Sequence, residues 1–332
     1  MILCADIGGT NARVALVENF QVRHLEIYPT SQVRDAVDLL TRFSADTGMS
    51  LPGRAALAAA GVVEGDAVKG TNIPWEIDCR RIRKEFGMEA CLVLNDFEAA
   101  AWGLLAVRPD KLVEIGGSRQ PDPLGTRAIL GAGTGLGEAV LLYCNGFWQV
   151  MRTEGGHASF SPRDELGFAL LKYLADRYGH VSFERLLSGQ GLVEIYTFII
   201  RNNQVLAGQF SGVSDAEKPS FVARLAAEGD RDALRAVNFF FNMLGEEASN
   251  LALKCLPSGG VYLAGGVTQH LMDFLDASSF RQAFEDKGRM KGLLQDIPVF
   301  AVMEPLLGIL GAAFMLTHNH SHSTASTALP DN

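Results

Sequence analysis

Cysteine is scarce in this sequence and follows no pairing pattern. The five cysteines lie singly within apolar segments, at Cys4, Cys79, Cys91, Cys144 and Cys255. An odd number without paired spacing argues against a disulfide framework, and it also lacks the paired thiolates of a zinc site. We therefore predict that the cysteines are reduced residues of the core.

Long apolar runs are missing as well. No window approaches the roughly 20 apolar residues that a membrane helix needs, and no basic and apolar leader precedes Asp6. We expect neither a membrane span nor secretion, and hence a cytoplasmic protein.

Basic charge is in deficit. The chain has 29 Lys and Arg residues against 38 Asp and Glu, which gives a formal net charge of −9. A negative protein repels a polyanion and offers few phosphate-neutralising groups, so no nucleic acid partner is expected. A length of 332 residues with 48% hydrophobic residues and 35 glycines is typical of a soluble α/β protein of two domains.

Hydrophobic periodicity predicts two sheets with helices packed on them, because the arrangement of the first hundred residues starts again after Pro109. Strands are expected near 2–7, 12–17, 21–28, 55–60, 90–94, 112–115 and 261–264, and on both sides of the glycines at 131–137. Helices are expected near 31–45, 96–106, 166–178, 191–200, 230–256 and 306–317. The polar segment 202–218 shows no periodicity and is predicted to be a mobile loop.

Two glycine motifs interrupt strand-like runs, "ADIGGTNAR" at Ala5–Arg13 and "GAGTGLG" at Gly131–Gly137. Neither is a dinucleotide fingerprint, because Leu136 stands at the third glycine position and both motifs lead into strands rather than helices. No Gly-Lys pair is followed by Ser or Thr, which excludes a P-loop. Laid over each other without a gap, Gly9–Arg13 falls on Gly133–Gly137, which indicates one unit used twice.

An isolated glycine pair between strands is most often a hairpin turn. The alternative is a phosphate held by two such turns, through backbone N–H groups of Gly8, Gly9 and Thr10 and of Gly133 and Thr134. Asp6 would then suit a hydrated magnesium ion that bridges phosphate oxygens.

Three motifs, in this order, resemble those of the actin, hexokinase and heat-shock chaperone ATPase superfamily. The first phosphate motif is matched by Asp6, Ile7, Gly8, Gly9, Thr10 and Asn11, the second by Gly131–Gly137, and the adenosine motif by Leu263-Ala264-Gly265-Gly266. The resemblance implies that Asp6–Asn11, Gly133, Thr134, Gly265 and Gly266 bind ATP with Mg²⁺.

Within that superfamily the chain resembles the bacterial glucokinases that lack a zinc-binding cysteine motif. The likeness runs from about residue 2 to 317 and includes "NDFEAAAWG", "TEGGH" and "GHVSFERLLSG", with Gln190 where a proline is expected. It implies ATP-dependent formation of glucose 6-phosphate as the first step of glycolysis, and a homodimer.

The same resemblance implies two actin-like (ribonuclease H-like) α/β domains with mixed sheets flanked by helices and a cleft between them. The small domain would comprise 1–106 with 305–317 and the large domain 107–304. Residues 318–332 are expected to be a disordered tail, although His318, His320 and His322 leave a metal site open as an alternative.

Asn95 and Asp96 follow a predicted buried strand. From the residues alone, an Asn or Asp here caps the next helix. The resemblance instead implies that Asp96 is the general base for the sugar hydroxyl and that Asn95 binds the sugar.

Glu154, His157 and Glu184 match sugar-binding positions of the family, where carboxylates accept from hydroxyl groups. Their spacing does not follow a helix face, which argues against a metal site. Asn72 is a further candidate for the sugar, whereas neighbouring Trp75 is expected to pack in the core.

Alternative functions are a kinase for another hexose, such as mannose or an N-acetylated sugar, and a sugar-responsive regulator on the same core. A regulator would need a DNA-binding extension, which an acidic chain whose first strand begins near Ile2 does not indicate. A chaperone-like ATPase would not need the cluster of acids and imidazole.

Overall fold

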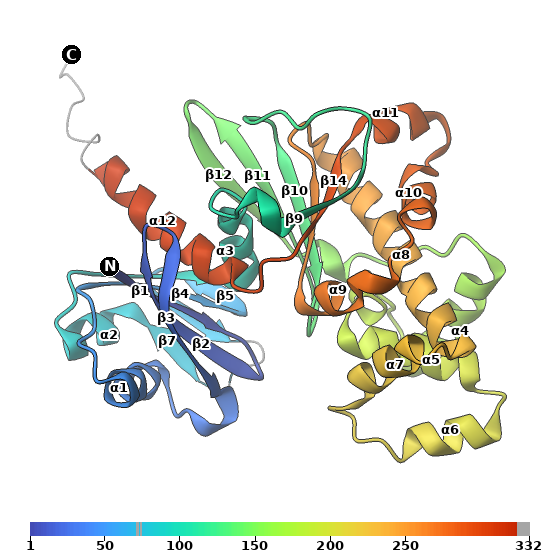
Figure 1. Cartoon of the computed structure of the whole chain (residues 1–332), viewed down its shortest axis with the longest axis horizontal. Helices are drawn as coiled ribbons and strands as arrows, with labels where there is room; N and C mark the ends of the chain where they lie inside the picture. Colours follow the sequence, from blue (N-terminus) through green and yellow to red (C-terminus); the bar gives the residue numbers. More distant parts are fainter. Residues whose placement is uncertain (71–72, 74, 324–332) are drawn as a thin grey trace. The chain divides into compact units, whose positions relative to one another are not determined.

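The computed structural model of the chain describes residues 1–70, 73 and 75–323, with side chains as far as residue 318 (Figure 1). Contacts divide the chain into two compact units. Unit 1 comprises Met1–Pro109 with Leu306–Asn332, and unit 2 comprises Asp110–Pro305. No helix within the described ranges is both long and apolar enough to cross a bilayer.

Unit 1 is built on a mixed sheet with the strand order β3-β2-β1-β4-β8. β1 pairs in parallel with β4, and β4 with β8, whereas β1, β2 and β3 form an antiparallel meander. The strands of unit 1, including three outside this sheet, are β1 (Ile2–Ile7), β2 (Asn11–Glu18), β3 (Gln21–Pro29), β4 (Arg54–Ala59), β5 (Gly61–Glu64), β6 (Ala67–Gly70), β7 (Glu76–Asp78) and β8 (Ala90–Asn95). Its helices are α1 (Ala36–Thr47), α2 (Cys79–Phe86), α3 (Asp96–Gly103) and α12 (Leu307–Ser323), with a 3₁₀ turn at Thr30–Gln32.

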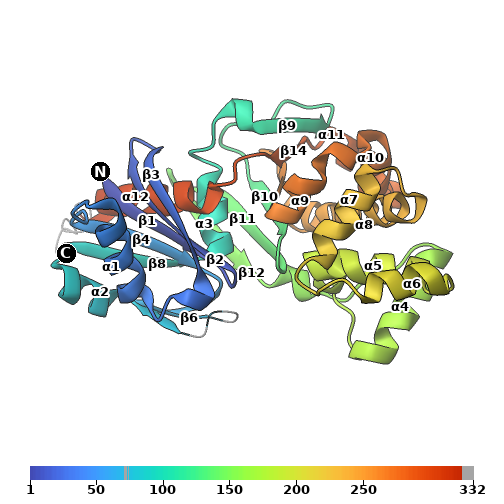
Figure 2. The same cartoon turned by 60° about the horizontal axis from the view of Figure 1, so that its bottom comes forward.

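Helices cover both faces of this sheet, which explains the nearly continuous apolar run of β1. Leu3 of β1 packs with Phe43 of α1 on one face. Cys4, the next residue, packs with Ala99 of α3 and Ile309 of α12 on the other face. Figure 2 shows α3 and α12 side by side there, with α1 and α2 on the opposite face.

Unit 2 repeats the arrangement with the strand order β12-β11-β10-β13-β14-β9. Again an antiparallel hairpin, β10 and β11, stands beside strands parallel to β10. Its strands are β9 (Leu112–Gly116), β10 (Arg127–Ala132), β11 (Leu136–Cys144), β12 (Phe147–Thr153), β13 (Val261–Ala264) and β14 (Val299–Val302). Its helices are α4 (Glu165–Tyr178), α5 (Gly189–Ile200), α6 (Gln204–Ser211), α7 (Lys218–Ala227), α8 (Arg231–Cys255), α9 (Gly266–Leu271), α10 (Ala277–Glu285) and α11 (Lys291–Asp296). Short 3₁₀ turns lie at Pro109–Lys111, Gly155–His157, Phe183–Arg185, Met272–Phe274 and Gly288–Met290.

The two glycine hairpins share a topology but differ in length. Ile7 faces Ala12 across the first hairpin, and Ala132 faces Leu136 across the second. The connection is therefore one residue longer in the first hairpin, while the superposition of Gly9–Arg13 on Gly133–Gly137 agrees with the second strands, where Ala12 falls on Leu136.

Three expectations from the sequence are wrong. Within the predicted loop 202–218 lies helix α6, which Asn203 caps and which packs its Phe210 edge-on against Tyr196 at 5.0 Å. Helix α12 continues to Ser323, past the expected end at 317, while 324–332 lie outside the described residues. Cys144 is exposed, and only local apolarity had placed it in the core.

Two cysteines that are far apart in the sequence meet in the core of unit 1. Cys79 begins α2, Cys91 lies in β8, and their sulfur atoms are 2.8 Å apart. Both are buried and reduced. The sequence showed no spacing that would pair them, because the contact arises when α2 packs onto the sheet.

Candidate active site

In unit 2, two glycine turns meet at the carboxyl edge of the sheet. β10 runs parallel to β13, with Gly131 opposite Ala264, so the turns that follow the two strands lie side by side. Gly265 has φ +92° and approaches the carbonyl of Ala132 so closely that a Cβ would collide with it. A Cβ on Gly133 or Gly266 would meet nothing within 4 Å, so space lies open above both turns.

Glu184 ties the first of these turns to a second part of the site. Its Oε2 accepts a hydrogen bond from the N–H of Leu136 at 3.0 Å, and a Cβ on Gly135 would collide with the same oxygen. The N–H of Gly189, at the start of α5, donates to the carbonyl of Gly133 at 2.9 Å. The hairpin that was predicted for phosphate and a residue that was predicted for sugar are therefore one connected structure.

The structure brings Glu154, His157 and Glu184 together. His157 Nε2 lies 3.9 Å from Glu154 Oε2, and His157 Nδ1 lies 3.8 Å from Glu184 Oε1. The side chains of Glu154 and His157 are 86% and 61% exposed, whereas that of Glu184 is 33% exposed. The segments are joined by backbone pairing of Ser159 with Ser182. Two acceptors and an imidazole thus face solvent from a framework that is itself hydrogen-bonded.

In unit 1, the parallel strands β1, β4 and β8 end at one edge of the sheet. Ile7 of β1 pairs with Ala59 of β4, and Ala59 pairs with Asn95 of β8. The turn after β1 is anchored by Thr30, whose hydroxyl donates to Gly8 O at 2.7 Å and whose N–H donates to Thr10 O at 2.9 Å. The first phosphate motif and the Asn95–Asp96 pair are therefore two strands apart, about 10 Å at the usual strand spacing.

Asn95 caps helix α3, as its residue type predicts. Its Oδ1 accepts from the N–H groups of Phe97 and Glu98 at 2.9 and 3.2 Å, and its Nδ2 donates to Gly61 O at 3.2 Å. One N–H of the side-chain amide is left for a ligand. Asp96, the first residue of α3, is half-buried and accepts from the N–H of Phe97 at 2.9 Å.

Asp6 lies between Arg13 and the amino end of α12. Its Oδ2 lies 3.5 Å from Nη1 of Arg13, the residue opposite it across the hairpin, and its side chain is 21% exposed. Burial raises the pKa of this carboxyl group, and Arg13 partly offsets the rise. A Cβ on Gly308 would lie 3.3 Å from the carboxyl group, so the amino end of α12, which favours negative charge, is close by.

A magnesium ion at Asp6 would take its other ligands from outside the protein. The structure describes the side chains of residues 1–70, 73 and 75–318. Among these, no group of three His, Cys, Asp or Glu residues could hold a metal. One carboxylate with water and phosphate oxygens is a fitting donor set for Mg²⁺, which usually keeps several waters.

The hairpins themselves use some of the N–H groups that were predicted for phosphate. Gly8 N donates to Asn11 O at 2.9 Å, and Gly133 N donates to Gly135 O at 2.8 Å. Each bond closes a turn, so these two donors are engaged, and the phosphate interpretation rests on the N–H groups of Gly9, Thr10 and Thr134.

Several other sequence predictions have a place in the structure. Trp75 packs against the core of unit 1 as expected, and Asn72 lies outside the described residues. His318 stacks on Phe314 of α12, with ring centroids 3.8 Å apart. Gln190, which replaces the expected proline, lies in the first turn of α5 and donates to the buried Glu194 at 3.3 Å.

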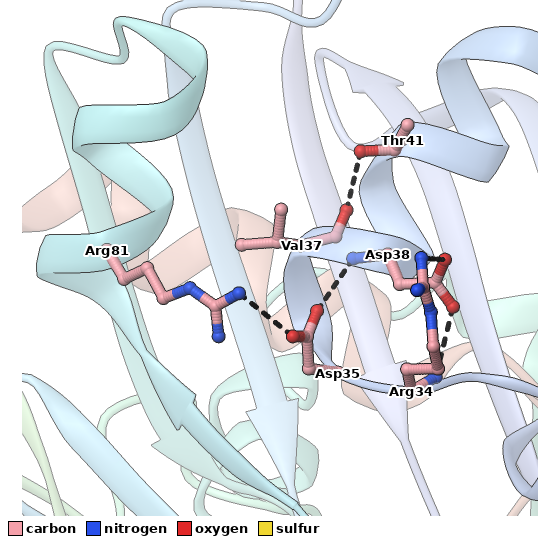
Figure 3. Close-up of a pocket in the computed structure, with 6 residues that line it drawn as sticks. All are labelled: Arg34, Asp35, Val37, Asp38, Thr41 and Arg81. Atoms are coloured by element: carbon pink, nitrogen blue, oxygen red, sulfur yellow. Dashed lines mark hydrogen bonds and ion pairs between the residues drawn. The ribbon is translucent and has the colours of Figure 1, made fainter.

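A surface depression in unit 1 is lined by none of the predicted site residues (Figure 3). It is lined by residues at the starts of α1 and α2. Its charged groups pair with one another: Arg34 lies 3.0 Å from Asp38, and Arg81 lies 3.0 Å from Asp35. Because these charges already neutralise each other, the depression offers little to a charged ligand.

Sequence reasoning missed the residues that hold the predicted ones. Arg13 and Thr30 were not singled out, although Arg13 lies within the first motif. The signal for Arg13 was the hairpin register, which places it opposite Asp6. Thr30 had no local signal, because its contact with Gly8 spans 22 residues.

Comparisons with known proteins give the family and the fold of the chain. The glucokinase family model matches residues 3–319. A glucokinase of Chromohalobacter salexigens is 41% identical over 96% of this chain and 97% of its own.

Among solved structures, a glucokinase from an Antarctic psychrotroph has a TM-score of 0.81 at 30% identity, over 96% of this chain and 98% of its own. A ROK family glucokinase from Streptomyces griseus, in complex with glucose and AMPPNP, has a TM-score of 0.68 at 22% identity, over 96% and 99% of the two chains. The predicted fold of two actin-like α/β domains with mixed sheets flanked by helices is confirmed. Since the family model covers nearly the whole sequence and a relative of almost equal length is 41% identical, this chain belongs to the glucokinase family, whose members are hexose kinases.

Proposed function

We propose that this protein transfers the γ-phosphoryl group of ATP to the 6-hydroxyl group of D-glucose. The observation that carries the proposal is the link in unit 2 between the Gly133–Thr134 turn and Glu184. A glycine turn with open space above it is suited to phosphate, and a partly exposed carboxylate is suited to sugar hydroxyls. A phosphoryl-transfer enzyme has to hold these two chemistries close together.

Asp96 is the proposed general base. Its carboxylate would accept the proton of the 6-hydroxyl as that oxygen attacks the γ-phosphorus, while the bond from phosphorus to the bridging oxygen of ADP breaks. The start of a helix that follows a buried strand is a rigid site, and the hydrogen bond from Phe97 N orients the carboxylate.

The sugar would be bound through its other hydroxyl groups by Asn95, Glu154, His157 and Glu184, and by Asn72. Asn95 and Glu184 are the half-buried members of this set, and half-buried polar groups discriminate strongly against analogues that lack the matching hydroxyl. In Asn95 the N–H that is not bonded to Gly61 is the donor left for this purpose.

The nucleotide would lie on Asp6–Asn11, Gly133–Thr134 and Gly265–Gly266, with Asp6 holding magnesium through water. Magnesium supplies charge neutralisation of the phosphates when it is bound. A homodimer in the cytoplasm that carries out the first step of glycolysis belongs to the same proposal, on the strength of the family resemblance.

The test is whether the purified protein forms glucose 6-phosphate from glucose in the presence of ATP and MgCl₂. Product formation is measured through a coupled reduction of NADP⁺. We expect product only when all three are present. A panel with mannose, N-acetylglucosamine and N-acetylmannosamine, compared by kcat/KM, should favour glucose. Absence of product with glucose, or a higher kcat/KM for another sugar, would overturn the assignment.

A further inference from the structure

Two acidic side chains are buried together beneath the turn Glu154–His157. Glu138 of β11 is 2% exposed and Glu247 of α8 is 1% exposed. Their carboxyl groups are hydrogen-bonded to each other, so one of the two carries a proton. Beyond this contact, Oε1 of each finds no hydrogen-bond partner in the described part of the chain.

The carboxyl group of Glu138 touches the turn directly. A Cβ on Gly155 would collide with Glu138 Oε2, and a Cβ on Gly156 would collide with Leu136 O. The turn therefore rests on β11 through two glycines. The hydroxyl of Thr153 donates to the backbone carbonyl of Glu138 at 3.1 Å and accepts from Gly155 N at 3.2 Å.

The proton belongs on Glu138. Burial and the adjacent Glu247 raise the pKa of Glu138 to about 8. Glu247 accepts from Asn250 Nδ2 at 2.8 Å as well as from Glu138, which favours its charged form even though burial raises its pKa. The proton of the pair thus resides on Glu138, which donates to Glu247.

Other charged groups surround the pair. Lys254 of α8 lowers the pKa of both carboxyl groups, and Lys287 acts on Glu247 and donates to Asn250 at 2.6 Å. Cys255 of α8 is also near Glu138. Glu154 and His157 of the turn are exposed on its outer side.

We propose that Glu138 is a positioning residue, which in its protonated form holds the turn Glu154–His157 in the geometry that binds sugar. The inference rests on the proposed function, since that turn is its sugar site. Loss of the proton would put two negative charges side by side in the core, and the turn above them has to shift for water to reach them.

The first experiment follows the proton without any substrate. The ¹³C resonance of the Glu138 carboxyl group, assigned by its loss in Glu138→Gln, is titrated together with the amide resonances of Gly155 and Gly156. We expect Glu138 to titrate near pH 8 and the two glycine resonances to move with it. Titration in the ordinary range of glutamate, about 4.3, or glycine resonances that do not follow Glu138, would overturn the proposal.

The second experiment measures KM for glucose from about pH 7 upward, above the ordinary pKa of histidine. If deprotonation weakens one sugar hydrogen bond, KM should rise about three- to tenfold through pH 8, with kcat changed less. Glu138→Gln keeps a neutral donor to Glu247, so its KM should match wild type at pH 7 and stay flat. Because this variant retains Lys287 and Lys254, a rise that persists in it would assign the effect to them and contradict the role of Glu138.

Glu246→Gln is the matched control. Glu246 is the neighbour of Glu247 on α8, is 7% exposed and also has a raised pKa, about 7, but its charged neighbours are Arg163, Lys287, Asp164 and Asp286. We expect this variant to keep the wild-type rise in KM. If no glucose is phosphorylated at all, the proposed function fails, while the resonances of Glu138, Gly155 and Gly156 still decide the proton and the turn.

Discussion

An acidic or amide residue at a helix start can cap the helix, and an acidic one can also accept a proton from a substrate. Both residue types are present here, as Asn95 and Asp96. Asn95 caps α3 by accepting from the N–H groups of Phe97 and Glu98, and the carboxylate of Asp96 also accepts from Phe97 N. The structure shows capping by Asn95, and the general-base role of Asp96 is our proposal.

Asp96→Asn should lower kcat by about 10²–10⁴-fold, because the amide cannot accept the proton of the attacking hydroxyl group. KM for glucose should change much less, since the amide keeps the shape of the side chain. Steady-state kinetics check both parameters, and circular dichroism checks the fold.

Glu98→Gln is the control for Asp96→Asn, because it removes a negative charge from the same first turn of α3. We expect this variant to lose no more than a few-fold in kcat. An equal loss in the two variants would attribute the effect of Asp96 to the helix rather than to proton transfer.

Asn95→Ser should separate capping from sugar binding. Serine keeps an oxygen that caps the helix but has no amide N–H, so KM for glucose should rise, and loss of the hydrogen bond to Gly61 O should cost about 1 kcal/mol of stability. Asn95→Ala should in addition lose about 1 kcal/mol in the free energy of unfolding. Urea unfolding and kinetics on both variants check this, and an unchanged KM in Asn95→Ser would remove Asn95 from the sugar site.

The hairpin β10–β11 connects the predicted phosphate turn to Glu184 through the hydrogen bond from Leu136 N. Glycine at 135 serves close approach rather than an unusual backbone angle, because its φ is not positive, whereas a side chain there would displace the carboxylate. The corresponding hairpin of unit 1, β1–β2, has a turn that is one residue longer, and Thr30 anchors that turn.

Gly135→Ala should therefore raise KM for glucose through displacement of Glu184, with a smaller effect on KM for ATP. Gly208→Ala in α6 is the matched control, because a Cβ there meets nothing within 4 Å. In a helix that exchange should be neutral or stabilising, by up to about 1 kcal/mol. Kinetics with each substrate varied in turn check the contrast, and a wild-type KM for glucose in Gly135→Ala would contradict it.

The stability of the whole molecule should fall as pH rises through the neutral range. Burial raises the pKa of Glu138 to about 8 and that of Glu246 to about 7, so the folded state keeps protons that the unfolded chain has released. Between the unfolded pKa, about 4.3, and these folded values, each group lowers the free energy of unfolding by about 1.4 kcal/mol per pH unit.

Chemical unfolding from about pH 5 to pH 9, followed by circular dichroism, measures this slope. Glu138→Gln does not titrate, so its free energy of unfolding should fall less steeply than that of wild type up to about pH 8. Parallel curves for the two proteins would show that Glu138 is ionised in the folded state.

Local patterns in the sequence were enough for the elements whose own residues decide them. The apolar run of β1 and the cap at Asn95 are settled by neighbours within a few positions. Helix α6 was missed because its stability depends on Phe210 packing on Tyr196, a contact that periodicity over 202–218 does not contain. The family motifs identified the site residues, but the motifs do not say which backbone groups are already bonded.

The order of residues alone established a repeated strand-turn-strand unit, the family, and the candidate acids and glycines, because each of these depends on short spacing along the chain. The tertiary structure decided which groups meet: Glu184 with the second glycine turn, Arg13 and Gly308 with Asp6, and Glu138 with Glu247. It also showed that Gly8 and Gly133 use their N–H groups to close their own hairpins. These are matters of distance and burial, and the free energy of a charge or a hydrogen bond depends on surroundings that distant segments supply.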